Sequence, residues 1–150
     1  MQKEEFIKLI DSLNLPKNKY YICSGGALLM MGIREQTSDL DMCITPSLLE
    51  ELKKNYDVKK SEKKFDNLFY INNLIDSNTK SHTEKFDHLF YINDLIEFFI
   101  NPNGEEIVAT FIDGYPCEPL ASVLAFKEKH RRPKDLIDIE NIKIYLKRTS

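Results

Sequence analysis

The sequence lacks the features that mark membrane, secreted and zinc-binding proteins. No apolar run reaches the roughly 20 residues that span a bilayer. The first residues, Met-Gln-Lys-Glu-Glu-Phe, are acidic where a signal peptide is basic and then apolar, so we expect a cytoplasmic protein. The three cysteines are odd in number and have no CxxC spacing, which argues against a disulfide framework or a zinc site.

The chain also lacks the broad positive charge that nonspecific binding to long nucleic acids needs. Its formal net charge is −3, so nucleic acid is the less favoured partner. Positions 127–134 are a local exception and read Lys-Glu-Lys-His-Arg-Arg-Pro-Lys. This segment could hold a polyphosphate or form a solvated helix end, and the pattern leaves both interpretations open.

What is present fits one α+β domain over residues 1–150. Hydrophobic residues make up 42% of the chain, enough for a core. Helical spacing predicts helices at 2–13, 27–31, 47–55, from 119 to the break at Pro133, and at about 134–147. Short apolar runs predict strands at 20–23, 39–44, 95–100 and 107–112. These elements indicate a mixed β-sheet flanked by helices. The last helix is expected to carry one apolar face, made by Leu136, Ile139, Ile142 and Leu146.

An internal tandem repeat occupies the middle of the chain. Residues 64–76 recur 21 positions later as residues 85–97, with ten of thirteen positions identical. Each copy predicts a β-hairpin with a turn at Asn-Asn or Asn-Asp. Two copies are too few for a solenoid, so we interpret them as a duplicated hairpin within one domain. The second copy continues into an apolar strand, and we take it as the structural original.

Asp39 and Asp41 are the first candidate site residues. Residues i and i+2 of a strand point to the same face, with their Cα atoms about 6.5–7 Å apart. We therefore expect the Asp39 and Asp41 carboxylates to converge on one point. Their mutual repulsion is relieved by a hard divalent cation, Mg²⁺ or alternatively Mn²⁺. Asp-x-Asp alone is a weak motif, because a solvated strand end looks the same.

Ser24, Gly25 and Gly26 form the second candidate feature, between a predicted strand and a predicted helix. Backbone N–H groups at such a turn could face a phosphate. The alternative is an ordinary strand-to-helix turn, which also favours glycine. The two features together are more specific than either alone.

These motifs, with Gly32, Arg34 and Thr37-Ser38 between them, resemble the nucleotidyltransferase superfamily of polymerase-β-like fold. The segments 124–127 and 132–139 resemble the end of abortive-infection and antitoxin-type bacterial nucleotidyltransferases. Small lincosamide and aminoglycoside nucleotidyltransferases share the general layout. The resemblance implies a third carboxylate on a neighbouring strand. Glu97 fits that role best, and Asp76, its repeat partner, is the alternative.

The same resemblance implies roles for three more residues. Lys127 would contact nucleotide phosphates, Asp135 would lie near the pocket, and Arg34 would steady a phosphate. Each has an alternative as an ordinary surface or helix-end charge. The implied activity is metal-dependent transfer of an NMP from an NTP such as ATP to a hydroxyl of a small molecule or protein. The alternative is a catalytically inactive nucleotide-binding or protein-interaction module of the same fold, with a homodimer as one possible assembly.

Overall fold

The computed structural model describes residues 1–60 and 89–150, which form a mixed sheet with helices around it. The described strands are β1 (Tyr20–Ile22), β2 (Leu40–Ile44), β3 (Lys59–Lys60), β4 (Leu89–Asn93), β5 (Ile96–Ile100), β6 (Thr110–Ile112) and β7 (Tyr115–Cys117). The described helices are α1 (Lys3–Leu13), α2 (Ser24–Met30), α3 (Pro46–Asn55), α6 (Leu120–His130) and α7 (Pro133–Thr149). The predicted α+β class and the mixed sheet are confirmed.

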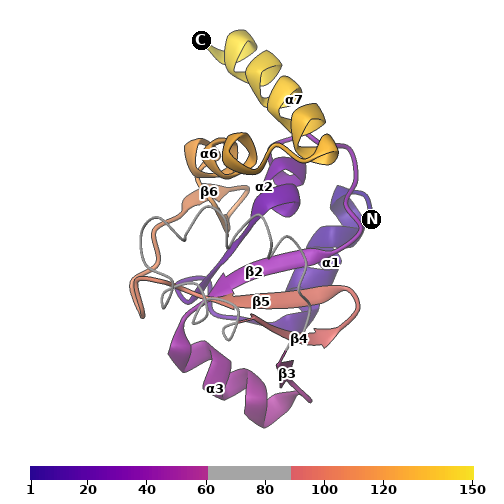
Figure 1. The fold of residues 1–150 in the computed structure, drawn as a ribbon. Helices are drawn as coiled ribbons and strands as arrows, with labels where there is room; N and C mark the ends of the chain where they lie inside the picture. Colours follow the sequence, from indigo (N-terminus) through magenta and orange to yellow (C-terminus); the bar gives the residue numbers. More distant parts are fainter. Residues whose placement is uncertain (61–88) are drawn as a thin grey trace.

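The sheet has seven strands in the order β3-β4-β5-β2-β1-β7-β6. The pairs β2–β5 and β1–β7 are parallel, and the other neighbours are antiparallel. Helix α1 crosses behind β2 and β5, α3 lies at one end of the sheet, and α2, α6 and α7 lie at the other (Figure 1). Among the described residues, no helix is both long enough and apolar enough to cross a membrane.

One face of the sheet is buried and the other is not fully covered by described residues. Alternation along β1, β2 and β5 sends one set of side chains into the core with the helices: Tyr20, Ile22, Leu40, Met42, Ile44, Ile96 and Phe98. The opposite set includes Tyr21, Asp41 and Glu97, each of which is half-buried. The two sheet faces therefore differ in chemistry, and the carboxylates are on the less buried one.

Local sequence explains most helix boundaries. Helix α1 buries Phe6, Ile10 and Leu13, which are three or four residues apart and share one face. At the start of α3, Thr45 Oγ1 accepts the Leu48 N–H at 3.2 Å and Pro46 is the first helical residue, as the Thr-Pro pair predicts.

Helix α2 and strands β6 and β7 differ from the prediction. Helix α2 begins at Ser24 and not at residue 27, so the glycines lie in its first turn. The strand predicted at 107–112 is present only as β6, from Thr110. Strand β7 was missed, because it has three residues, includes Pro116, and depends on non-local pairing with β1.

The predicted apolar face of the last helix is also wrong in part. Ile139 and Ile142 are buried, but Leu136 and Leu146 are 44% and 43% exposed. The buried stripe of α7 instead contains Asp135 and Asp138. Ion pairs with neighbouring cations compensate the charges of these buried carboxylates. A pattern of apolar residues cannot predict that two aspartates are buried while two leucines are exposed.

The second repeat copy contains a hairpin. Strands β4 and β5 pair antiparallel, and the turn is at Asp94-Leu95, with Asn93 Oδ1 accepting the Leu95 and Ile96 N–H groups at 2.8 and 3.1 Å. Strand β5 lies inside the sheet between β4 and β2. The first copy, residues 64–76, lies outside the described residues, so its predicted hairpin stays a prediction.

Candidate functional site

Two carboxylates lie side by side on neighbouring parallel strands. Asp41 of β2 is the register partner of Glu97 of β5, and such strands are about 4.8 Å apart. Both residues alternate with buried apolar neighbours, so both project from the less buried face. The structure therefore places Glu97 beside Asp41, where the resemblance implies a third carboxylate.

Asp39 precedes β2 by one residue and is half-buried. Its carbonyl accepts the Thr37 Oγ1 hydroxyl at 3.3 Å. Thr37 is in turn fixed by Met1, because the Thr37 N–H donates to the Met1 carbonyl at 2.9 Å and the N-terminal amine donates to the Thr37 carbonyl at 2.6 Å. The segment that leads into β2 is thus held to Met1 by two backbone hydrogen bonds at Thr37.

The turn between β1 and α2 lies next to Asp41. The Cys23 N–H donates to the Asp41 carbonyl at 2.9 Å. Ser24 has φ of +53°, a left-handed conformation that residues other than glycine rarely adopt. Its N–H donates to Glu118 Oε1 at 3.0 Å, and Ser122 Oγ donates to Glu118 Oε2 at 2.7 Å. The Ser24 amide, a predicted phosphate ligand, is therefore bonded to a carboxylate.

The two glycines of the turn have different surroundings. A Cβ at Gly25 would collide with Nη1 of Arg34. A Cβ at Gly26 would lie 2.6 Å from Phe6 Cζ and 2.8 Å from Ile22 Cγ2. Close packing of α2 on α1 and β1 is sufficient to require glycine at position 26. Gly25 faces the polar side of the turn, where the Arg34 guanidinium lies.

A cluster of five charged side chains joins the segment after α2 to α6 and α7. Lys127 Nζ lies 2.9 Å from Asp138 Oδ2 and 3.4 Å from Asp135 Oδ1. The Arg34 guanidinium pairs with Asp138, and Arg132 donates to Asp135 from Nε at 2.7 Å and Nη2 at 3.1 Å. The cluster thus holds three cations and two carboxylates, and it brings together the predicted residues Arg34, Lys127 and Asp135.

The cationic side chains of this cluster differ in solvent exposure. The side chain of Lys127 is 3% exposed, whereas that of Arg34 is 29% exposed. Lys127 is therefore not the solvated helix lysine of the alternative interpretation. Arg34, which touches both Gly25 and Asp138, has the more accessible charge.

Hydrogen bonds and charge keep Asp135 ionised. Burial alone would raise the pKa of its carboxyl. The side-chain and backbone hydrogen bonds from Arg132, with the charges of Arg132 and Lys127, outweigh burial and hold the pKa below its usual 3.8. The buried carboxylate is thereby a fixed negative charge around which the cations are arranged.

The carboxylates give the turn a negative electrostatic environment. The pKa of the Cys23 thiol is raised well above its usual value by its hydrogen bond with Cys43 and by burial, and the nearby Glu118 and Asp41 carboxylates add to the effect. The Asp41 and Glu118 carboxylates are therefore close enough to the Cys23 thiol to act on it electrostatically.

Within residues 1–60 and 89–150, no group of three or more His, Cys, Asp or Glu residues is arranged to hold a metal ion. The paired carboxylates of Asp41 and Glu97 have the oxygen chemistry of a magnesium ligand set, and in the described part of the chain no third His, Cys, Asp or Glu side chain completes such a group with them. Asp76 lies outside the described residues. No family model, curated protein or solved structure matches this chain.

Three polar residues of this region, Glu118, Arg132 and Asp138, were not given individual site roles from the sequence. A signal existed for Asp138, because it follows Asp135 by three residues and therefore shares its helix face. Arg132 belongs to the basic segment already noted at 127–134. Glu118 had no local signal, since its position depends on the parallel pairing of β7 with β1.

Proposed function

We propose that this chain is a metal-dependent nucleotidyltransferase that moves an NMP from an NTP to a hydroxyl of a small molecule or protein in the cytoplasm. The observation that carries the proposal is the register pairing of Asp41 with Glu97 beside the β1–α2 turn. Two carboxylates on adjacent strands suit a divalent cation, and the Arg34 guanidinium, which lies against Gly25, suits the phosphates that the cation would accompany.

The Arg34 cluster supports the phosphate side of the proposal. Arg34 is partly exposed and lies against Gly25, and a guanidinium binds phosphate oxygens through two parallel hydrogen bonds. Lys127 is buried behind it and shares Asp138 with it. In this assignment Arg34 contacts the phosphates, while Lys127 holds Asp138 and so positions Arg34.

The reaction uses few protein groups. An acceptor hydroxyl oxygen forms a bond to the α-phosphorus of the NTP, the bond from that phosphorus to the bridging oxygen breaks, and pyrophosphate leaves. A Mg²⁺ ion, when bound, would polarise the phosphoryl oxygens. Asp39 and Asp41 would hold it with Glu97, and Glu97 would assist removal of the acceptor's hydroxyl proton.

The test is transfer of labelled nucleotide by Asp41→Asn and Glu97→Gln variants, with circular dichroism to verify folding. Each variant should transfer labelled nucleotide at least about 100-fold more slowly, since each removes a charge that the reaction needs. Glu106→Gln, a matched change of an exposed glutamate away from the carboxylate pair, should retain activity. Undiminished transfer by folded Asp41→Asn would overturn the assignment.

Two observations favour an inactive nucleotide-binding module as the second candidate. The described residues contain no ready group of three metal ligands, and Glu118 already satisfies the Ser24 amide. Calorimetric titration with Mg²⁺ and each NTP, followed by a pyrophosphate-release assay against candidate acceptors, separates the candidates. Metal-dependent binding without turnover identifies the module, and binding with turnover identifies the enzyme.

A further inference from the structure

A hollow of about 580 Å³ lies between α7 and residues 32–36, away from the carboxylate pair. Its apolar lining comes from Ile33 of the loop and from Ile137 and Ile144 of α7. Ile137 is 66% exposed and Ile144 is 43% exposed, although both are large apolar side chains. Neither Asp41 nor Glu97 lines the hollow, but Arg34 of the proposed phosphate site does, so the hollow borders that site.

Cationic side chains lie at both ends of this apolar surface. Lys134 lies in the first turn of α7 and Arg148 near its last, and both are exposed lining residues. Among the described residues neither forms an ion pair. Arg34 and Asp138, which also line the hollow, compensate each other, and Glu35 leaves one positive charge in excess.

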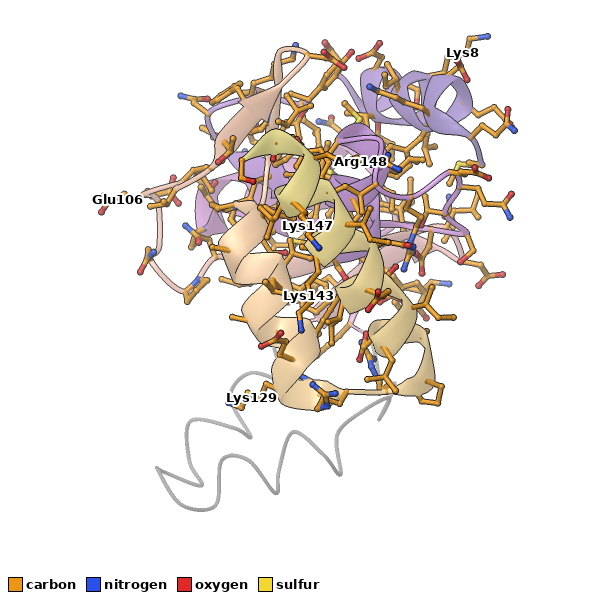
Figure 2. The ribbon with its side chains drawn as sticks, turned by 90° about the horizontal axis from the view of Figure 1, so that it is seen from above. Lys8, Glu106, Lys129, Lys143, Lys147 and Arg148 are labelled. Carbon is orange, nitrogen blue, oxygen red and sulfur yellow. The ribbon has the colours of Figure 1, made fainter. Side chains whose placement is uncertain are left out.

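Other cations lie on α6 and α7 outside the lining of the hollow, and one of them, Lys143, is paired with Glu128 of α6. Seen from above, α6 presents Lys129, and α7 presents Lys143, Lys147 and Arg148 (Figure 2). Asp135 and Asp138, two of the acidic residues of α7, are buried in the Arg34 cluster and do not offset these cations at the surface. The exposed face of α7 is consequently more positive than its sequence suggests, although the whole chain carries −3.

We propose that this hollow is a docking surface for an acidic amphipathic helix of a partner protein. Along α7, at 1.5 Å per residue, the two isoleucines are about 10 Å apart and the terminal cations about 21 Å apart. A helix laid along α7 presents residues with the same spacing. It would place two apolar residues seven positions apart on the isoleucines, and flanking acidic residues opposite Lys134 and Arg148.

Charge argues against a second copy of this chain as the occupant. If two α7 helices paired antiparallel about Asn141, Lys134 of each copy would face Arg148 of the other. If they paired parallel, each cation would face its own equivalent. Both arrangements bring like charges together at the two ends of the contact, which disfavours self-association.

The test uses a fluorescent Ala-rich helical peptide of about 20 residues, with two leucines seven positions apart and a glutamate beyond each. Its control has lysines in place of the glutamates. In anisotropy titrations at low salt, the acidic peptide should bind at least about tenfold tighter than the basic one, and high salt should reduce that difference. Equal binding of both peptides, or no binding of the acidic peptide up to about 1 mM, would overturn the proposal.

Charge-reversed variants locate the binding surface. Lys134→Glu with Arg148→Glu should weaken the acidic peptide about tenfold and improve the basic one. The matched control is Lys143→Glu with Lys147→Glu, which makes the same charge change on α7 outside the hollow; equal loss in both double variants would refute the assignment. Sedimentation at high protein concentration tests whether a second copy of this chain binds the hollow instead. Self-association that Ile137→Asp abolishes would identify the second copy as the occupant and overturn the proposal. None of these variants replaces Asp41, Glu97 or Arg34, and peptide binding is measured without nucleotide, so failure of this proposal is distinguishable from failure of the proposed transferase activity.

Discussion

Replacing each glycine of the β1–α2 turn by alanine should separate a packing role from a polar one. In Gly26→Ala the new methyl group would lie 2.6 Å from Phe6 Cζ and 2.8 Å from Ile22 Cγ2, and Phe6 and Ile22 are fully buried. In Gly25→Ala the new methyl group meets the end of the Arg34 side chain, which is 29% exposed and can swing away.

The expected magnitudes follow from these contacts. Overpacking of a close-packed core costs about 1–3 kcal/mol, and alanine regains up to about 1 kcal/mol over glycine in a helix. Gly26→Ala should therefore lower the free energy of unfolding by about 1–2 kcal/mol. Gly25→Ala should be within about 0.5 kcal/mol of the wild type, because the alanine gain offsets a partly exposed ion pair that solvent screens.

Urea unfolding followed by circular dichroism measures both effects. With a denaturant slope of about 2 kcal/mol/M, the midpoint of Gly26→Ala should fall by about 0.5–1 M, and that of Gly25→Ala should scarcely move. If Gly26→Ala is as stable as the wild type while Gly25→Ala is destabilised, the packing explanation is wrong. In that case Gly26 would regain its predicted place as a residue required by a bound phosphate.

Three further predictions concern buried groups. Asp138→Ala leaves Lys127 with one carboxylate at 3.4 Å and should lower the free energy of unfolding in urea by about 3–5 kcal/mol. Lys143→Ala breaks an exposed ion pair and should lower it by less than about 0.5 kcal/mol. Equal losses in the two variants would contradict the role of burial. Because the pKa of Asp135 is lowered on folding, its stabilisation is complete above its usual 3.8 and is lost as the pH falls below that value through the folded pKa. Asp135→Asn should flatten this part of the stability profile between about pH 5 and pH 2, and a parallel decline of both proteins would refute the attribution. Burial raises the pKa of Cys117 to about 12, so iodoacetamide at pH 8 should leave this thiol unmodified in the folded protein, as peptide mass mapping can verify.

The sequence was sufficient for the fold where structure is local. Apolar spacing found α1, and the Thr45-Pro46 pair located the start of α3. The alternating run after Asp39 predicted β2, and the apolar run after Asp94 predicted β5. Strand β7 could not be found, because a three-residue strand with a proline has no periodicity and forms through its parallel neighbour.

The candidate site was predictable to a similar extent. Two of the residues singled out from the sequence, Asp41 and Glu97, are register partners in the sheet, whereas Asp39 precedes β2 and has no register partner. The glycines were identified, but the packing that requires Gly26 comes from Phe6, which is far from it in sequence. Glu118 depends wholly on tertiary structure, and a single sequence carries no trace of the distance between it and Ser24.

The strained Ser24 connects these features physically. A non-glycine residue at φ of +53° costs about 1–3 kcal/mol and persists only where its surroundings fix it. Here the Cys23 N–H is held by Asp41, the Ser24 N–H by Glu118, and Gly25 lies against Arg34. The turn is therefore fixed by Asp41 of β2, by Glu118 directly after β7, and by Arg34 of the segment after α2. A ligand that displaced Glu118 from the Ser24 amide would have to replace the hydrogen bond that stabilises the strain, and an anionic oxygen does this best.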